Sequence, residues 1–201
     1  YNYCKPEIES HNKSFINVKN LRHPLIENIL TDELYVPNDI SLGYDEDGIL
    51  LYGTNAVGKS SLIRSIGICV IMAQSGFYVP ASTMKFKPYQ SIFTRILGND
   101  NLFKSLSTFA VEMSELRNIL TLSNENSLIL GDELCSGTEN DSAISIFASG
   151  LIHMHQKRSS FIFATHFHEL TKLPETHSNI KNLQVAVHEE NNSINFLHRI
   201  V

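Results

Sequence analysis

The segment G-T-N-A-V-G-K-S at residues 53–60 constrains this 201-residue chain more than any other feature. It fits the pattern G-x-x-x-x-G-K-S, in which glycines let the backbone wrap around an anion and the next helix adds its positive end. An apolar run at 49–52 predicts a buried strand before it, and a helical pattern runs from Lys59 to about Ser75. This order predicts a phosphate-binding loop, with Lys59 at the β- and γ-phosphates of a nucleotide and Ser60 on Mg²⁺.

A second apolar run, at 127–130, predicts another buried strand that ends at Gly131-Asp132-Glu133. Carboxylates at a strand end are often only solvated acids. Downstream of a phosphate-binding loop, however, they complete a nucleotide site, with Asp132 near Mg²⁺ and Glu133 polarising the attacking water.

A third strand, expected at 160–164, ends at Thr165-His166. Its neighbours carry phosphate chemistry, so His166 is predicted to sense the γ-phosphate or the attacking water. Two alternatives stay open: His166 is a hydrogen-bonded residue at a strand end, or it binds a metal together with His168 and Glu169.

Strands alternate with helices along the chain, which predicts an α/β fold with a parallel sheet covered on both faces and ligands at the carboxyl ends of its strands. The helix from Lys59 is apolar at so many positions, Ile71 among them, that we expect it to be buried nearly all round. The other expected elements are strands at 39–42 and 92–97, helices at 107–122 and 142–156, and a hairpin-like region at 183–201.

The composition limits the classes of partner that this chain is expected to bind directly. Lys and Arg number 16 against 21 Asp and Glu, a net charge of −5, so DNA contacts are expected on parts of the protein outside this chain. No apolar run is long enough for a transmembrane helix, so no membrane partner is expected. Cys4, Cys69 and Cys135 have neither metal-type spacing nor a disulfide framework, which favours an intracellular, reducing compartment. The start lacks both Met and a signal-peptide pattern, so a fragment is expected.

From about Arg22 to its end, the chain resembles the ATPase domain of the MutS family of DNA mismatch-recognition proteins. Besides the phosphate-binding loop, the segment 107–113 resembles the family's STFxxEM motif, and 163–170 resembles its FATHxxEL motif. The other matching segments are 22–25, which resembles an RHP motif, 77–81 and 92–95.

The resemblance implies a P-loop NTPase of the ABC ATPase type, mostly parallel with an antiparallel β portion. This ATPase domain is expected over 21–201, after a lead-in segment at 1–20 from a preceding domain, and without the family's carboxyl-terminal helix-turn-helix. It further implies binding and hydrolysis of ATP with Mg²⁺ at a composite interface in a homo- or heterodimer of MutS-like subunits. The ATP cycle would switch domains located elsewhere that hold mismatched or otherwise damaged double-stranded DNA.

Site roles follow from the resemblance at matching positions. Asp132 and Ser60 would hold the metal, Glu133 would be the general base and His166 a switch histidine, while Ser107 would reach the γ-phosphate of the neighbouring subunit's ATP. Tyr35 would stack on adenine and His198 would close its other side, unless they are simply a packed ring and a surface imidazole. The residues implied in nucleotide binding within the loop are Gly53, Thr54, Asn55, Ala56, Val57, Gly58, Lys59, Ser60 and Ser61.

The chain departs from the family pattern at several positions. Thr54 replaces the usual Pro, Ala56-Val57 replace Met-Gly, Ser105 replaces Gly, and 135–140 keep only Gly-Thr of the usual loop. The divergent loop at 135–140 leaves open an ATP-gated dimerisation scaffold with little hydrolysis. The other alternative is an ABC-type ATPase of transport or chromosome maintenance, but 105–113 lacks that class's L-S-G-G-Q-like signature.

Overall fold

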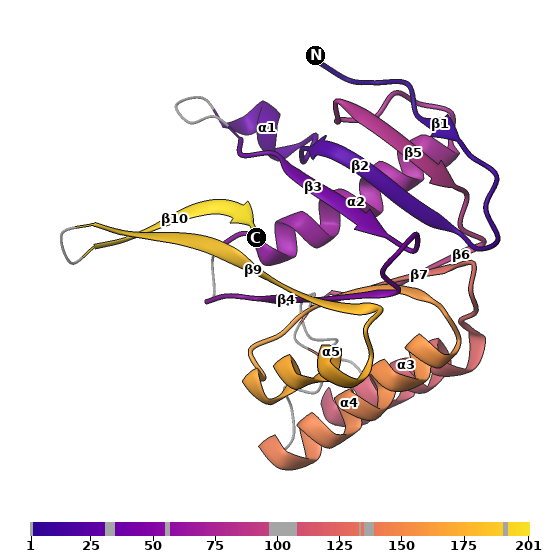
Figure 1. Cartoon of the computed structure of the whole chain (residues 1–201), viewed down its shortest axis with the longest axis vertical. Coiled ribbons are helices and arrows are strands. Elements are labelled where there is room, and N and C mark those ends of the chain that lie inside the picture. Colours follow the sequence, from indigo (N-terminus) through magenta and orange to yellow (C-terminus); the bar gives the residue numbers. More distant parts are fainter. Residues whose placement is uncertain are drawn as a thin grey trace.

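The computed structural model describes residues 2–30, 35–54, 57–96, 108–132, 134, 139–190 and 193–201. It is an α/β structure with two mixed sheets (Figure 1). The larger sheet has the strand order β10 (Ser193–Ile200), β9 (Ile180–Glu190), β4 (Gly48–Tyr52), β8 (Ser160–Ala164), β7 (Ser127–Asp132) and β6 (Ser91–Arg95). The smaller sheet has the order β1 (Glu7–Ile8), β5 (Thr83–Lys87), β2 (Phe15–Leu21) and β3 (Asn38–Leu42).

Three long helices connect these strands: α2 (Lys59–Gln74), α3 (Thr108–Leu122) and α4 (Asn140–Gln156). Short turns of helix are α1 (Ile26–Ile29), the 3₁₀ helix η1 (His168–Lys172) and α5 (Leu173–Thr176). The helices and strands expected from the sequence are therefore present, and β9 with β10 forms the expected hairpin.

The larger sheet is parallel from β9 through β4, β8 and β7 to β6, and only β10 runs antiparallel, against β9. Helix α2 lies between the two sheets, whereas α3, α4 and α5 cover the opposite face of the larger sheet (Figure 1). Side chains alternate accordingly along β4: Leu51 packs with α2, and Leu50 and Tyr52 pack on the other side. The predicted coverage of both faces is confirmed.

The expectation that α2 is buried nearly all round is wrong on one side. Ile63 and Ile66 are fully buried between the sheets, but Ile71 is 55% exposed. The two sheets cover opposite faces of the helix, and the flank that carries Ile71 faces solvent. An apolar residue on a helix therefore did not indicate burial at this position.

Residues on both sides of position 20 share one strand. β2 crosses the expected limit of the lead-in segment, and it pairs with both β3 and β5. Residues 15–20 thus pack as part of the α/β structure, whereas the assignment of 1–20 to a preceding domain stays a prediction.

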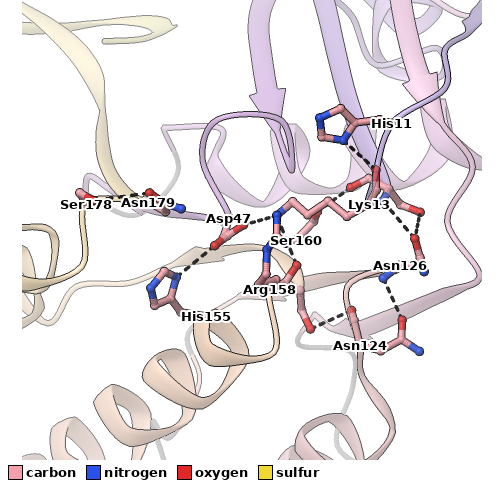
Figure 2. A network of polar contacts seen from close by, with 12 residues as sticks. His11, Lys13, Asp47, Asn124, Asn126, His155, Arg158, Ser160, Ser178 and Asn179 are labelled. Atoms are coloured by element: carbon pink, nitrogen blue, oxygen red, sulfur yellow. Dashed lines mark hydrogen bonds and ion pairs between the residues drawn. The ribbon is translucent and has the colours of Figure 1, made fainter.

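A buried polar network fastens the residues before β2 to the amino ends of β4 and β8 (Figure 2). Lys13 forms an ion pair with Asp47, and both side chains are at most 5% exposed. The second carboxylate oxygen of Asp47 lies 3.1 Å from Nδ1 of His155, and Lys13 also donates to the carbonyl of Arg158 at 3.3 Å. Burial lowers the pKa of Lys13, and the adjacent Asp47 carboxylate opposes that shift. Removing either partner would leave a buried charge uncompensated.

Within the described ranges, none of the helices has the length and apolar character that crossing a bilayer requires. Cys4 and Cys69 are free thiols, and burial raises the pKa of Cys69 to about 12.

Candidate nucleotide-binding site

The loop after β4 turns the chain directly into α2. Gly58 has a φ of 97°, a left-handed conformation that favours glycine, and α2 begins at the next residue. The amide of Leu62 donates to the carbonyl of Gly58 at 3.0 Å, which closes the first helical turn. The earlier amides of the turn therefore have no carbonyl within the helix to bind, and this helix end favours an anion.

Lys59 extends back across this loop. Its ammonium group donates to the backbone carbonyls of Gly53 and, at 2.8 Å, Thr54, and the residue is 6% exposed. Two carbonyls on one side hold the charge over the loop, where it would meet phosphate oxygens. Val57 is buried and Ser61 half-buried beside it.

Ser60 and Asp132 are joined directly. The Ser60 hydroxyl donates to an Asp132 carboxylate oxygen, and Asp132 is only 8% exposed. Asp132 ends β7 opposite Ala164 of β8, so the parallel register brings it to the edge at which the loop between β4 and α2 begins. Gly131 precedes it because a Cβ there would lie 2.0 Å from the Phe163 ring.

His166 follows β8 at this same edge, between the ends of β4 and β7. The amide of Thr165 donates to Leu51 of β4 at 3.1 Å, and the Thr165 hydroxyl accepts from the amide of Phe167 at 3.1 Å. These bonds fix the turn while the His166 side chain remains exposed. No group of three His, Cys, Asp or Glu residues suited to a metal occurs in the part of the chain that is described, so the reading of His166, His168 and Glu169 as ligands gains no support.

A cavity of about 310 Å³ opens beside the loop, and both residues predicted to hold the adenine ring line it. Tyr35 and His198 line it together with Gly58, and burial raises the pKa of Tyr35, which keeps its hydroxyl neutral. The rest of its wall is largely apolar: Ile26, Leu30, Val36, Asn38, Val57, Ser61, Leu62, Val185 and Ile200. Such a wall suits a flat heteroaromatic ring.

His198 is held in place by contacts that the sequence analysis missed. Its Nδ1 donates to the carbonyl of Val57 at 3.0 Å, which ties the last hairpin to the loop between β4 and α2. Asn38 donates to the carbonyl of His198 at 3.0 Å and accepts from the amide of Ile200 at 2.8 Å. His198 itself has a φ of 51°, at an irregularity in the β9–β10 pairing. No local signal marks Asn38, because its partners lie about 160 positions away.

An ion-pair cluster anchors α3 to the edge strand. Arg95, at the carboxyl end of β6, pairs with fully buried Glu112 at 3.1 Å and with Glu115 at 3.0 Å. Arg95 belongs to the segment 92–95 and Glu112 to the segment 107–113. Both segments carried the family resemblance in the sequence, but neither of these residues had been given a role.

Four of the expected site residues lie outside the described residues: Asn55, Ala56, Ser107 and Glu133. The divergent loop at 135–138 lies outside them as well. The structure brings together Gly53, Thr54, Lys59, Ser60 and Asp132 by direct contact, and Tyr35, Val57, Gly58, Ser61 and His198 around one cavity.

Comparison with known proteins points to one family. Residues 49–201 match the family described as MutS domain V. The chain is 41% identical over 201 residues to the DNA mismatch repair protein MutS of Lactobacillus delbrueckii subsp. bulgaricus. The matched region is 100% of this chain and 23% of that protein. It is 41% identical to the mitochondrial DNA mismatch repair protein mutS homolog of Sarcophyton glaucum, over 96% of this chain and 20% of that protein. A putative DNA mismatch repair protein mutS homolog of Acanthamoeba polyphaga mimivirus is 38% identical over 98% of this chain. The chain thus spans about a fifth of the length of these relatives.

Proposed function

Because the chain belongs to the MutS family, we propose that it binds and hydrolyses Mg-ATP as the ATPase part of a DNA mismatch repair protein. The fold we assign is that of a P-loop NTPase of the ABC type. The observation that carries the proposal is the hydrogen bond between Ser60 and Asp132, because it joins the start of α2 to the end of β7 beside the buried ammonium group of Lys59.

The triphosphate would lie against the first turn of α2. Backbone amides of the loop and of this turn would bind the phosphate oxygens, and the helix dipole would add to their attraction. The Lys59 ammonium would exchange its carbonyl partners for β- and γ-phosphate oxygens, which are stronger acceptors because they are charged.

The Ser60 and Asp132 oxygens fit a magnesium ion. Mg²⁺ prefers oxygen ligands and is usually held by one or two carboxylates together with water and substrate phosphates. A hydroxyl and a carboxylate that already touch supply two such oxygens. When bound, the ion would neutralise charge on the β- and γ-phosphates.

The adenine ring would enter the cavity beside the loop. Tyr35 and His198 both line that cavity, and rings of this kind stack on heteroaromatic bases. The position of His198 depends on Asn38 and Val57, so the hairpin and the loop would close on the base together.

Hydrolysis needs a base and a group that responds to the γ-phosphate. We assign Glu133 as the base: it accepts a proton from water as the water oxygen attacks the γ-phosphorus, and the bond from that phosphorus to the bridging oxygen of ADP breaks. His166, exposed at the same edge, would contact the γ-phosphate or the water. Ser107 would complete the site of a neighbouring subunit, so the two subunits would part when the γ-phosphate leaves.

The net charge of −5 supports the proposal that this part of the protein binds the nucleotide and the partner subunit. Mismatched or damaged duplex DNA would be held by other domains of the protein. Free thiols at Cys4 and Cys69 favour a reducing compartment.

Mixing two inactive variants tests hydrolysis at a composite site. Glu133→Gln and Ser107→Ala should each lose ATP turnover. Half of the dimers in an equal mixture contain one subunit of each variant, and one of their two sites pairs an unmutated Glu133 from one subunit with an unmutated Ser107 from the other. The mixture should therefore regain about a quarter of wild-type turnover. Turnover well above background that neither variant reduces would contradict the assigned roles. Wild-type turnover at background, with ATP binding and dimers retained, would instead favour the scaffold.

A further inference from the structure

A second surface feature lies away from the nucleotide site. An open groove of about 550 Å³ runs between α3 and α4. Met113, Leu116 and Leu120 supply its apolar surface, and Arg117, Thr121, His153 and Lys157 complete its lining.

The walls of the groove are two helix faces. Its five α3 residues follow the spacing i, i+3, i+4, i+7 and i+8, which places them on one stripe. His153 lies in the last turn of α4, and Lys157 is the C-cap residue that follows this helix. The helices approach closely at Gly150, where a Cβ would lie 3.6 Å from Leu116. The Lys157 ammonium donates to the carbonyls of Leu120, Thr121 and Ser123 at the end of α3, so the groove is fixed at that end.

The charged residues of the groove are all basic or potentially basic. No carboxylate appears among the described residues that line it, and the acidic residues Glu112 and Glu115 of α3 are engaged by Arg95 elsewhere. Arg117 is exposed, and its guanidinium forms no hydrogen bond or ion pair with the described residues. The groove is therefore positively charged on a chain whose net charge is −5.

We propose that this groove binds an acidic amphipathic helix from a partner protein. Apolar side chains of that helix would pack on Met113, Leu116 and Leu120, and its carboxylates would pair with Arg117 and His153. The α3 stripe from 113 to 121 spans about 12 Å, which is enough to seat about two turns of helix. The apolar floor favours a peptide over DNA, because a phosphate backbone has no apolar face to bury there.

A designed peptide probes this directly. A fluorescein-labelled peptide of about sixteen residues would carry Leu in a helical stripe with Glu on both sides, and anisotropy would be measured at low salt against the 201-residue chain. We expect saturable binding that weakens at least about tenfold in Arg117→Glu with His153→Glu and in high salt. Arg64→Glu, an exposed change on α2, should leave binding intact, and circular dichroism would verify folding of each variant.

Two control peptides and two competing occupants complete the test. A scrambled peptide of the same composition and a peptide with Lys in place of Glu should bind at least about tenfold more weakly. Equal binding of either, or no binding of the Glu peptide, would overturn the proposal. Duplex DNA that binds more tightly than the peptide and competes for the groove would overturn it in favour of nucleic acid. Self-association abolished by Arg117→Glu would overturn it in favour of a second copy.

Discussion

The Ser60 hydroxyl donates a hydrogen bond to Asp132 across 72 positions of sequence, and so joins the first turn of α2 to the end of β7. The contact places one neutral and one charged oxygen side by side. Mg²⁺ is usually held by one or two carboxylates together with water and substrate phosphates, so the Asp132 carboxylate would be the charged protein ligand of the ion.

Asp132→Asn should therefore remove the effect of magnesium on nucleotide affinity. Asn retains an oxygen that can accept from Ser60 but lacks the charge, so ATP affinity should fall about tenfold with Mg²⁺ and stay unchanged in EDTA. Fluorescent nucleotide titrations in both buffers measure this, with exposed Asp141→Asn as the matched control. A wild-type magnesium effect in Asp132→Asn would rule out Asp132 as the metal-linked acid.

Tyr35→Ala should weaken binding of the base and leave binding of the phosphates. Loss of one stacking ring from the cavity wall should lower ATP affinity by about tenfold, while the affinity for inorganic triphosphate stays the same. Competition between the two ligands measures the difference. Tyr44→Ala, a change of an exposed tyrosine, serves as control. Equal losses for both ligands would mean that Tyr35 supports the loop rather than the base.

Gly131→Ala should destabilise the end of β7 because the new methyl group would overlap the buried Phe163 ring. We expect a loss of about 1–3 kcal/mol in the free energy of unfolding. Gly150→Ala is the matched control: its Cβ would meet Leu116 at an ordinary 3.6 Å, and alanine within α4 should leave stability equal or raise it.

A double variant identifies the cause. Phe163→Leu shortens the side chain, so Gly131→Ala should cost less in that background, with a coupling of about 1 kcal/mol in urea denaturation. Strictly additive losses would show that Phe163 is not the obstacle.

Tyr52→Phe should be tolerated at neutral pH and should protect the protein at alkaline pH. Tyr52 is 7% exposed, and its hydroxyl has no hydrogen-bond partner among the described residues, so its removal should leave stability equal or raise it by about 1 kcal/mol. Burial, with a smaller contribution from the Glu169 carboxylate, raises the pKa of Tyr52 to about 12.

The sign of the pH effect follows from the two states. Both keep the phenol proton below about pH 10, but between about pH 10 and about pH 12 only the unfolded state releases it. Wild-type stability should thus fall over this interval by about 2 kcal/mol more than that of Tyr52→Phe. Urea denaturation at several pH values measures the difference, with exposed Tyr44→Phe as control. Parallel curves for wild type and Tyr52→Phe would contradict a buried, proton-retaining phenol.

Local patterns predicted the elements that carry the site. The loop between β4 and α2 is continuous in sequence, so its glycines and Lys59 are recognisable without any distant contact. Asp132 and His166 could be placed at the same edge because consecutive parallel strands present their carboxyl ends together, and the register of β7 with β8 confirms that rule.

Contacts between distant segments could not be predicted in this way. The pairing of β2 with β5 depends on register between segments with no shared local signal, and Asn38 reaches His198 only after the hairpin has folded back. The buried Lys13–Asp47 ion pair likewise resembles two ordinary surface charges in the sequence.

Calorimetric titration of Mg-ATP into wild type and Lys59→Ala tests the central claim most directly, with exposed Arg64→Ala on the same helix as control. The buried ammonium is positioned by two loop carbonyls, and no other lysine of the described residues donates to them. Wild type and Arg64→Ala should bind alike, and Lys59→Ala about a hundredfold more weakly, because a positioned charge at the phosphates is lost. Equal affinity of Lys59→Ala and wild type would contradict the nucleotide site assigned to this loop.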